Sequence, residues 1–277
     1  MRLSHSHRWW LAALFAATLA LVLSVLADEP TVDLELVLTV DVSLSMDLDE
    51  QRLQRDGYIA AFRDPQVRSA IQSGSRGRIA VTYIEWAGAA TQQTVMPWTV
   101  IDSAEAAELF ATSLEGKPIS RYRMTSISGA LTYSEQALER NPHKGARRVI
   151  DVSGDGPNNS GVPVIPVRDA LVKKGIVING LPVLLKTGGP NSAFDIPNLD
   201  DYFASCVIGG AGAFSLPVRE KEGFAAAIRQ KLLLEISGLT PEPQARLIRT
   251  RDEAKEEPVD CMIGEKLWRR YMDGNYR

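Results

Sequence analysis

Histidine, cysteine and the common catalytic motifs are scarce in this chain of 277 residues. Of its three histidines only His143 lies beyond residue 27, and no Gly-x-Ser-x-Gly elbow occurs, so a Ser-His-Asp hydrolase is not expected. The chain has neither a Gly-x-x-x-x-Gly-Lys-Ser/Thr phosphate loop nor a His-Glu-x-x-His zinc motif. Two cysteines are too few for a zinc cluster. These absences argue against the most familiar hydrolase, nucleotide-binding and zinc-dependent classes.

A surplus of positive charge is also absent. Lysine and arginine number 31 against 34 aspartates and glutamates, which gives a formal net charge of −3. Residues 1–27 contain Arg2 and Arg8 and no acidic residue, so without them the net charge is −5. Nothing in this balance resembles the basic surface of a nucleic-acid-binding protein. With 45% hydrophobic and 23% charged residues, the chain can form a sizeable core.

Residues 1–27 have the pattern of a secretory signal peptide. Basic residues precede an apolar stretch over residues 9–27, and Val25 and Ala27 are small residues suited to a cleavage site. The stretch of 19 residues is nearly long enough to span a bilayer, so an uncleaved membrane anchor is the alternative. Both alternatives predict an exported protein.

The two cysteines, Cys206 and Cys261, both lie in the exported part of the chain. An even number of cysteines in an oxidising compartment favours a disulfide between them. The alternative is two separate buried thiols.

Strand-like and helix-like segments alternate along the rest of the chain, which predicts an α/β fold with an open, mostly parallel, Rossmann-like sheet and helices on both faces. The pattern predicts one domain over residues 28–238 and a C-terminal extension over 239–277 that Cys261 ties back. The expected strands are 34–40, 78–86, 91–98, 148–152, 176–181 and 213–217. The expected helices are 49–62, 103–114, 126–139, 165–174, 199–205 and 222–237.

Oxygen-bearing side chains at alternate positions follow the first expected strand. Asp41, Ser43 and Ser45 come directly after the buried run 34–40, and in an extended segment such residues point to one side. One carboxylate and two hydroxyls form part of an oxygen shell of the type that Mg²⁺ accepts. The alternative is a capped turn, because Asp and Ser are common turn and cap residues.

Two further segments are predicted to complete the shell, because ligands of open α/β sheets bind beyond the carboxyl ends of the strands. Asp155 follows the expected strand 148–152 and has glycine on both sides, which lets the backbone turn sharply. Thr125 places a hydroxyl at the start of the expected helix 126–139. The candidate metal ligands are therefore Asp41, Ser43, Ser45, Thr125 and Asp155.

These three elements, in this order, resemble the von Willebrand factor type A domain and its metal-ion-dependent adhesion site over roughly residues 32–237. The segments DEQRLQRDGYIAAFRDP, RRVIDVSGDGPNNSG, INGLPVL and CVIGGAGAF also resemble a bacterial exported family of unknown function. The resemblance implies that the hydroxyls contact Mg²⁺ or Mn²⁺ directly or through water, and that the aspartates act mostly through water. One departure is that the run 122–124 before Thr125 lacks the glycines often seen there, which makes Ser126 the substitute candidate.

The resulting hypothesis is a non-enzymatic, exported module that binds a protein or peptide through a divalent cation. An acidic group of the partner would complete the coordination shell. Two alternatives remain at the level of the sequence: a cation with a purely structural role, and a metal-dependent hydrolase. No general base stands out beside the predicted cation, which disfavours the hydrolase.

Overall fold

A computed structural model of the protein describes residues 31–185, 194–241 and 258–274. The predicted signal peptide, residues 1–27, lies outside these ranges. Within them, no helix is both long enough and apolar enough to cross a membrane.

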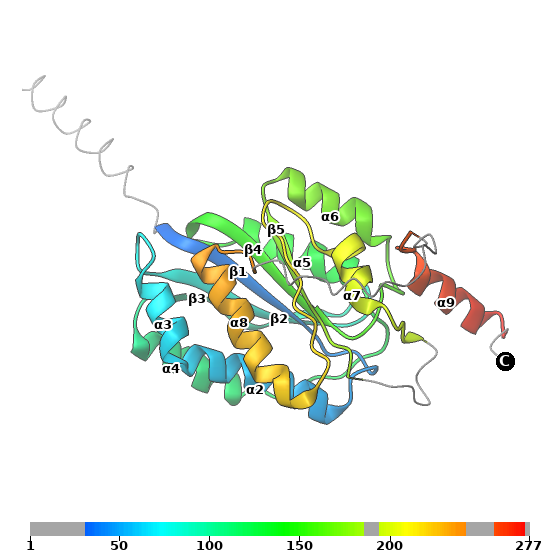
Figure 1. The fold of residues 1–277 in the computed structure, drawn as a ribbon, viewed down its shortest axis with the longest axis horizontal. Coiled ribbons are helices and arrows are strands. Elements are labelled where there is room, and N and C mark those ends of the chain that lie inside the picture. The colour runs from blue at the N-terminus through cyan, green and yellow to red at the C-terminus, as the bar shows by residue number, and fades with distance from the viewer. Residues whose placement is uncertain (1–30, 186–193, 242–257, 275–277) are drawn as a thin grey trace, which may run out of the picture.

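A five-stranded sheet in the order β3-β2-β1-β4-β5 forms the centre of the molecule, and only β3 runs antiparallel to its neighbour (Figure 1). β1 is in the middle and is buried over almost its whole length, as expected for a strand that helices cover on both faces. The strands are β1 (Thr31–Asp41), β2 (Ile79–Trp86), β3 (Gln92–Ile101), β4 (Lys144–Gly154) and β5 (Val177–Pro182).

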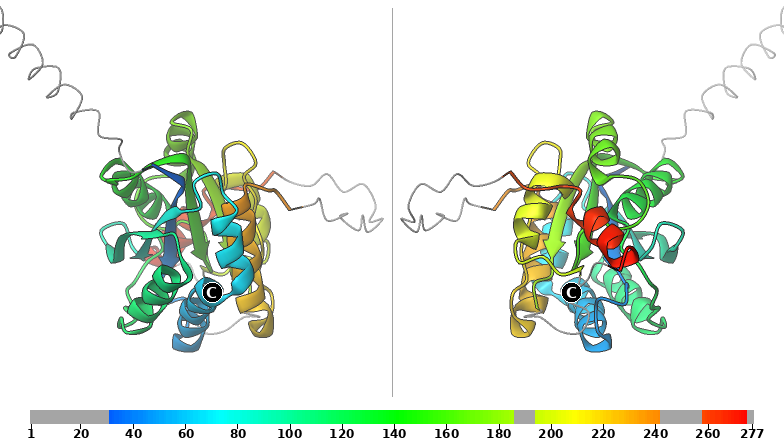
Figure 2. Two further views of the ribbon diagram at one scale, coloured as in Figure 1. Left: turned by 90° about the vertical axis from the view of Figure 1, so that its left-hand side faces the viewer. Right: turned by 90° about the vertical axis from the view of Figure 1, so that its right-hand side faces the viewer.

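Helices cover both faces of the sheet and create two hydrophobic cores (Figures 1 and 2). One core contains side chains of α2 (Leu48–Arg63), α3 (Pro65–Gln72), α4 (Ala104–Glu115) and α8 (Phe224–Ser237). The other contains side chains of α5 (Ile127–Glu139), α6 (Val164–Lys173), α7 (Leu199–Tyr202) and the π-helix Phe203–Val207. A short 3₁₀ helix (Lys221–Gly223) leads into α8, and α9 (Ile263–Met272) lies near the C-terminus.

Local sequence explains where several helices begin. Asp47 and Glu50 form a capping box at the start of α2, in which each side chain accepts a hydrogen bond from the other residue's backbone N–H. Asp64 caps α3, whose first residue is Pro65. Helices α2 and α8 then pack closely, because Gly57 has no side chain: a Cβ there would lie 2.5 Å from Ile228 Cδ1.

The predicted α/β fold is confirmed, with differences at particular segments. The expected strand 213–217 is wrong: the backbone of this segment joins β5 through an isolated bridge, Gly180 to Ser215, and not through a continuous ladder. The expected helix 199–205 is α7 followed by a π-helix that extends to Val207. Helices α3 and α9 were not expected. The helix α3 was missed although Asp64 and Pro65 form a standard helix start.

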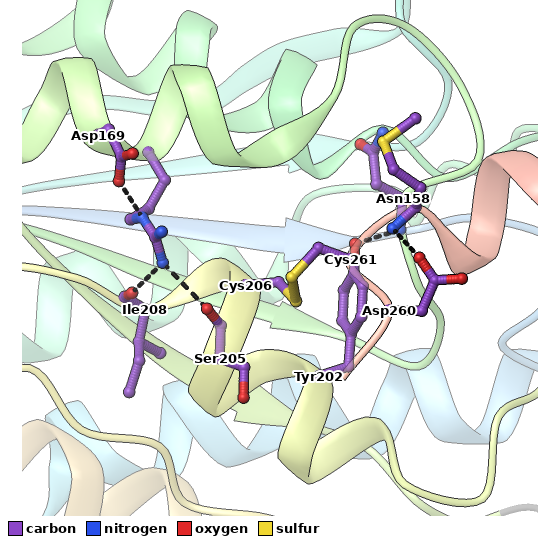
Figure 3. Close-up of a disulfide and its surroundings, with 10 residues drawn as sticks. Asn158, Asp169, Tyr202, Ser205, Cys206, Ile208, Asp260 and Cys261 are labelled. Carbon is purple, nitrogen blue, oxygen red and sulfur yellow. Dashed lines mark hydrogen bonds and ion pairs between the residues drawn. A yellow bond between two sulfur atoms is a disulfide. The ribbon is translucent and has the colours of Figure 1, made fainter. Parts of the chain in front are cut away.

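The structure joins Cys206 and Cys261 in the predicted disulfide, with their Cα atoms 5.6 Å apart (Figure 3). Cys206 belongs to the π-helix and Cys261 directly precedes α9. The bridge therefore connects the C-terminal helix to the core of the sheet domain.

Candidate metal centre

The sheet brings the ends of β1 and β4 together. Asp41, the last residue of β1, pairs with Trp86 of β2, and Val40 pairs with Ser153 of β4. Since β1 and β4 are parallel, the loops that follow them leave the same edge of the sheet, and Asp155 comes next to the loop that begins at Asp41.

Hydrogen bonds connect four of the five predicted ligands. The Ser43 N–H donates to Asp41 Oδ1 at 2.7 Å, and the hydroxyl oxygens of Ser43 and Ser45 lie 2.6 Å apart. The Ser45 hydroxyl donates to Asp155 Oδ1 at 2.6 Å. The expected extended conformation through Ser45 is wrong, because β1 ends at Asp41 and the chain turns, with the Met46 N–H donating to the Ser43 carbonyl at 3.2 Å. This turn brings the two serine hydroxyls together.

Thr125 reaches the same region on a third loop, and the loop after β4 holds it there. The Thr125 N–H donates to Asn159 Oδ1 at 2.8 Å, and the Thr125 carbonyl accepts from the Asn159 N–H at 2.8 Å. This reciprocal pair connects the loop that carries Asp155 with the start of α5. The Thr125 side chain is 4% exposed.

The run before Thr125 contains a left-handed backbone conformation at a residue that is not glycine, although glycine adopts this conformation more easily. Met124 has a φ of 72°, in the left-handed region that costs a non-glycine residue about 1–2 kcal/mol. It is the only non-glycine residue with a positive φ in the described ranges. The substitute candidate, Ser126, has another role: its hydroxyl accepts from the Gly129 N–H at 3.1 Å and caps α5.

A cavity of about 370 Å³ opens beside these side chains. Three of the predicted ligands, Ser43, Ser45 and Thr125, line it directly. Asp41 and Asp155 are not among the residues that line it, and their exposed fractions are 0% and 7%. The remaining lining residues come from the neighbouring loops and from α9: Leu44, Arg123, Met124, Gly156, Pro157, Asn159, Phe194, Asp195, Trp268 and Tyr271.

Burial makes the negative charge of the Asp41 carboxylate costly. Burial and the nearby charge of Asp155 raise the pKa of Asp41 from 3.8 to about 8, and none of the main influences on this pKa is a basic side chain. Among the described residues, Asp41 Oδ2 has no hydrogen-bond partner. Arg121 is not among the main influences on this pKa, and its guanidinium donates to the Met46 carbonyl at 2.9 Å.

The donor set suits a hard divalent cation. The described residues contain no group of three His, Cys, Asp or Glu side chains placed to hold a metal. The constellation instead consists of two carboxylates and three hydroxyls, which are the oxygen ligands typical of Mg²⁺ and Mn²⁺ sites. The buried Asp41 Oδ2 without a partner is the atom that a cation would satisfy.

Three aromatic residues at this site were not predicted from the sequence. Phe194 precedes α7, and Trp268 and Tyr271 belong to α9, which the predicted elements did not include. The spacing of Ile263, Leu267 and Tyr271 is the i, i+4, i+8 pattern of one helix face and would have indicated a helix. No local signal indicates that this helix lies against the candidate metal centre.

Solved structures with a similar fold include several von Willebrand factor type A domains. Proximal thread matrix protein 1 from the mussel byssus, in a structure with a zinc-occupied MIDAS motif, is 14% identical with a TM-score of 0.52; the match covers 74% of this chain and 46% of that one. A von Willebrand factor type A protein from Catenulispora acidiphila is 12% identical with a TM-score of 0.52, over 74% and 43% of the two chains. The vWF domain of a type V pili tip protein from Porphyromonas gingivalis is 9% identical with a TM-score of 0.50, over 76% and 98%.

The chain spans less than half the length of the first two of these proteins, and identities this low show the fold alone. No curated protein matches the chain. A family model described as "Protein of unknown function (DUF1194)" matches residues 31–240. The chain therefore belongs to this family, and its fold is that of a von Willebrand factor type A domain.

Proposed function

We propose that this protein is an exported adhesion-type module that binds a protein or peptide partner through a divalent cation, Mg²⁺ or Mn²⁺. Asp41, Ser43, Ser45, Thr125 and Asp155 would hold the cation, and an acidic group of the partner would complete its shell. When bound, the cation would supply the positive charge that attracts the partner's carboxylate. The proposal treats the protein as a binding module and not as an enzyme.

The carrying observation is the buried carboxylate of Asp41 at the edge of the sheet. The Asp41 carboxylate is fully buried beside Asp155, and one of its oxygens has no partner among the described residues. Burying a carboxylate without a counter-charge is costly, so this arrangement is stable at neutral pH only if a cation or a proton accompanies it.

The cavity favours an adhesive role over a purely structural one. Ser43, Ser45 and Thr125 face an open space of about 370 Å³, so a partner group can reach the hydroxyl side of the constellation. Hydroxyl ligands are neutral, which would leave a bound cation with positive charge to attract an added anion. The MIDAS motif of the mussel protein and the pilus location of the Porphyromonas domain support this proposal by analogy.

We further propose that residues 1–27 direct export to a bacterial periplasm, that residues 28–238 form the binding domain, and that residues 239–277 are an extension tied back by Cys261. The disulfide between Cys206 and Cys261 supports an oxidising compartment.

The test is binding of an acidic peptide in Mg²⁺, in EDTA, and in the Asp41→Ala variant. We expect binding in Mg²⁺ that is lost in EDTA and in the variant. Asp102→Ala, at an exposed aspartate that follows β3, is the control and should bind like the wild type. Equal affinity under all of these conditions would remove the proposal. Stabilisation by Mg²⁺ without any peptide binding would leave only a structural role for the cation.

A further inference from the structure

An aromatic cluster stands beside the candidate metal centre. The ring centroids of Phe194 and Trp268 are 5.8 Å apart, those of Phe194 and Tyr271 are 5.5 Å apart, and those of Trp268 and Tyr271 are 5.7 Å apart. Tyr271 is 51% exposed. We call Phe194, Trp268 and Tyr271 the aromatic wall. It gives one side of the cavity an apolar, polarisable surface.

The aromatic wall and the hydroxyl ligands line the same cavity. Ser43, Ser45 and Thr125 form the polar side, and the three rings form the apolar side. A ligand that fills this space would meet both surfaces at once. Of the described residues that line it, Arg123 and Asp195 are charged, one of each sign, so we expect the predicted cation to decide the preference for an anion.

The loop after β4 holds α9, and with it the wall, in a defined position. The Asn158 side-chain amide donates to Glu265 Oε1 at 2.8 Å. Gly264 lies so close to this loop that a Cβ there would be 2.1 Å from the Asn158 carbonyl oxygen. The disulfide at Cys261 adds a covalent connection just before the helix (Figure 3).

This attachment makes the wall part of a preorganised site. Asn158 also accepts from the Ser128 N–H of α5 at 3.0 Å, so the residue that contacts α9 is itself fixed beside the start of α5. A rigid surface loses little conformational entropy when a ligand binds, which favours selective contacts.

We propose that the cavity accepts a carboxylate carried next to an aromatic or large aliphatic group, with the carboxylate toward Ser43, Ser45 and Thr125 and the apolar group against the aromatic wall. This inference rests on the proposed function and adds the class of ligand to it. A volume of about 370 Å³ lies at the lower end of the range of ligand pockets, which suits a carboxylate and one neighbouring side chain. The chemistry is shared by a free aromatic carboxylic acid and by an acidic residue followed by an aromatic residue in a peptide.

The experiment compares two matched pairs of probes by calorimetry in Mg²⁺ and in EDTA. One pair is acetate and 3-phenylpropionate; the other is acetyl-Gly-Asp-Gly-Gly-amide and acetyl-Gly-Asp-Phe-Gly-amide. In Mg²⁺ the aromatic member of at least one pair should bind at least about fivefold more tightly, from the typical strength of aromatic contacts. The pair that shows the preference identifies the source of the ligand.

Substitutions in α9 test whether the aromatic wall causes the preference for the aromatic probes. Trp268→Ala should abolish the preference by weakening binding of the aromatic probes, whereas Trp268→Phe should retain most of the preference. Met272→Ala is the matched control, since Met272 is 65% exposed on the same helix and does not line the cavity. An unchanged response of each variant's melting temperature to Mg²⁺ shows that it is folded.

The outcomes separate this inference from the proposed function. Binding that depends on Mg²⁺ without any aromatic preference would overturn the inference and leave the proposed function standing. Tighter binding of all probes to Trp268→Ala would also overturn it, because the helix would then be obstructing the site. If no probe requires Mg²⁺, the proposed function fails and the inference fails with it.

Discussion

Two neighbouring pairs of carboxylates are buried in this molecule, and they are neutralised in different ways. Asp151 of β4 and Glu235 of α8 lie in the interior with Lys231, whose ammonium nitrogen is 2.6 Å from Asp151 Oδ1 and also pairs with Glu235. Asp41 and Asp155 lie at the edge of the sheet, and none of the main influences on the Asp41 pKa is a basic side chain. Lys231 is therefore the cation of the first pair, whereas the main influences that oppose the rise of the Asp41 pKa are hydrogen bonds.

The pKa values reflect this difference. Burial and Asp151 raise the pKa of Glu235 from 4.5 to about 7, but Lys231 and a hydrogen bond from Asn179 oppose the rise. Burial and Asp155 raise the pKa of Asp41 to about 8, opposed only by hydrogen bonds. A buried carboxylate needs a positive charge or a proton, so Asp41, whose Oδ2 has no hydrogen-bond partner among the described residues, is a candidate to bind a cation from solution.

The largest expected effect comes from removing the internal cation. Lys231→Met should destabilise the protein by about 3–5 kcal/mol, because Asp151 and Glu235 would then be buried without a counter-charge. Denaturant unfolding measures this loss, and Mg²⁺ should not restore it. Lys174→Met is the control, since the Lys174 side chain is 50% exposed and its ion pairs should contribute little. Equal losses of unfolding free energy in both variants would show that Lys231 is not specifically needed to neutralise the buried acids.

Addition of Mg²⁺ should have the next largest effect. At a concentration about a hundredfold above the dissociation constant, the cation should stabilise the native state by about 2.7 kcal/mol. The measurement is thermal or denaturant unfolding with Mg²⁺ and with EDTA. Ca²⁺ and Mn²⁺ in parallel titrations would rank the preference of the oxygen donors. Identical unfolding curves in Mg²⁺ and EDTA would contradict the distinction between the two carboxylate pairs.

The dependence of stability on pH separates the two pairs further. Both pKa values are higher in the folded than in the unfolded state, so the stabilisation is complete below the ordinary values of 3.8 and 4.5 and is lost as pH rises through about 7 for Glu235 and about 8 for Asp41. In EDTA the free energy of unfolding should therefore fall from pH 5 to pH 8, by up to ~1.4 kcal/mol per pH unit for each group.

Mg²⁺ or the substitution Asp41→Asn should remove only the Asp41 part of this fall. The Glu235 part should remain, because Glu235 belongs to the lysine network and not to the metal centre. Unfolding curves at several pH values check both statements. A fall with pH that neither Mg²⁺ nor the substitution reduces would show that Asp41 is not its source.

The smallest expected effect concerns the backbone at Met124, directly before the candidate ligand Thr125. Met124→Gly should stabilise the protein by less than ~1 kcal/mol, because relief of the left-handed conformation exceeds the entropy cost of glycine only slightly. Gly175→Ala is the reverse control: Gly175 has a φ of 74° with open space around its Cβ position, so this variant should lose about 1 kcal/mol. A destabilised Met124→Gly would mean that the methionine side chain is required.

Much of the fold follows from short-range patterns. The alternation of strand and helix segments predicted a mostly parallel sheet with two covered faces, and five of the six expected strands are present. The sixth, 213–217, was wrong because an apolar segment can pack beside a strand through single bridges without a continuous ladder. The candidate ligands were predicted from sequence because they follow strand ends, and parallel strands bring those ends to one edge.

Side-chain partners that are distant in sequence could not be predicted in this way. The apolar residues of α8, spaced four apart, predicted a face directed to the core. Lys231 and Glu235 are also four residues apart and would by themselves suggest an exposed ion pair, yet both are buried opposite Asp151. Likewise, contacts between segments that are distant in sequence place α9 beside the metal centre: the disulfide, the close approach of Gly264 to Asn158, and the hydrogen bond from Asn158 to Glu265.

The sequence alone predicted the strands of the sheet, most of the helices and the candidate oxygen ligands at one edge, because periodicity and strand ends are local properties. Only the tertiary structure decided that Lys231 pairs with Asp151 and Glu235, and which helix covers the cavity. The physical reason is that the charge balance and the walls of a site depend on residues that approach through space, from segments whose own patterns do not indicate their partners.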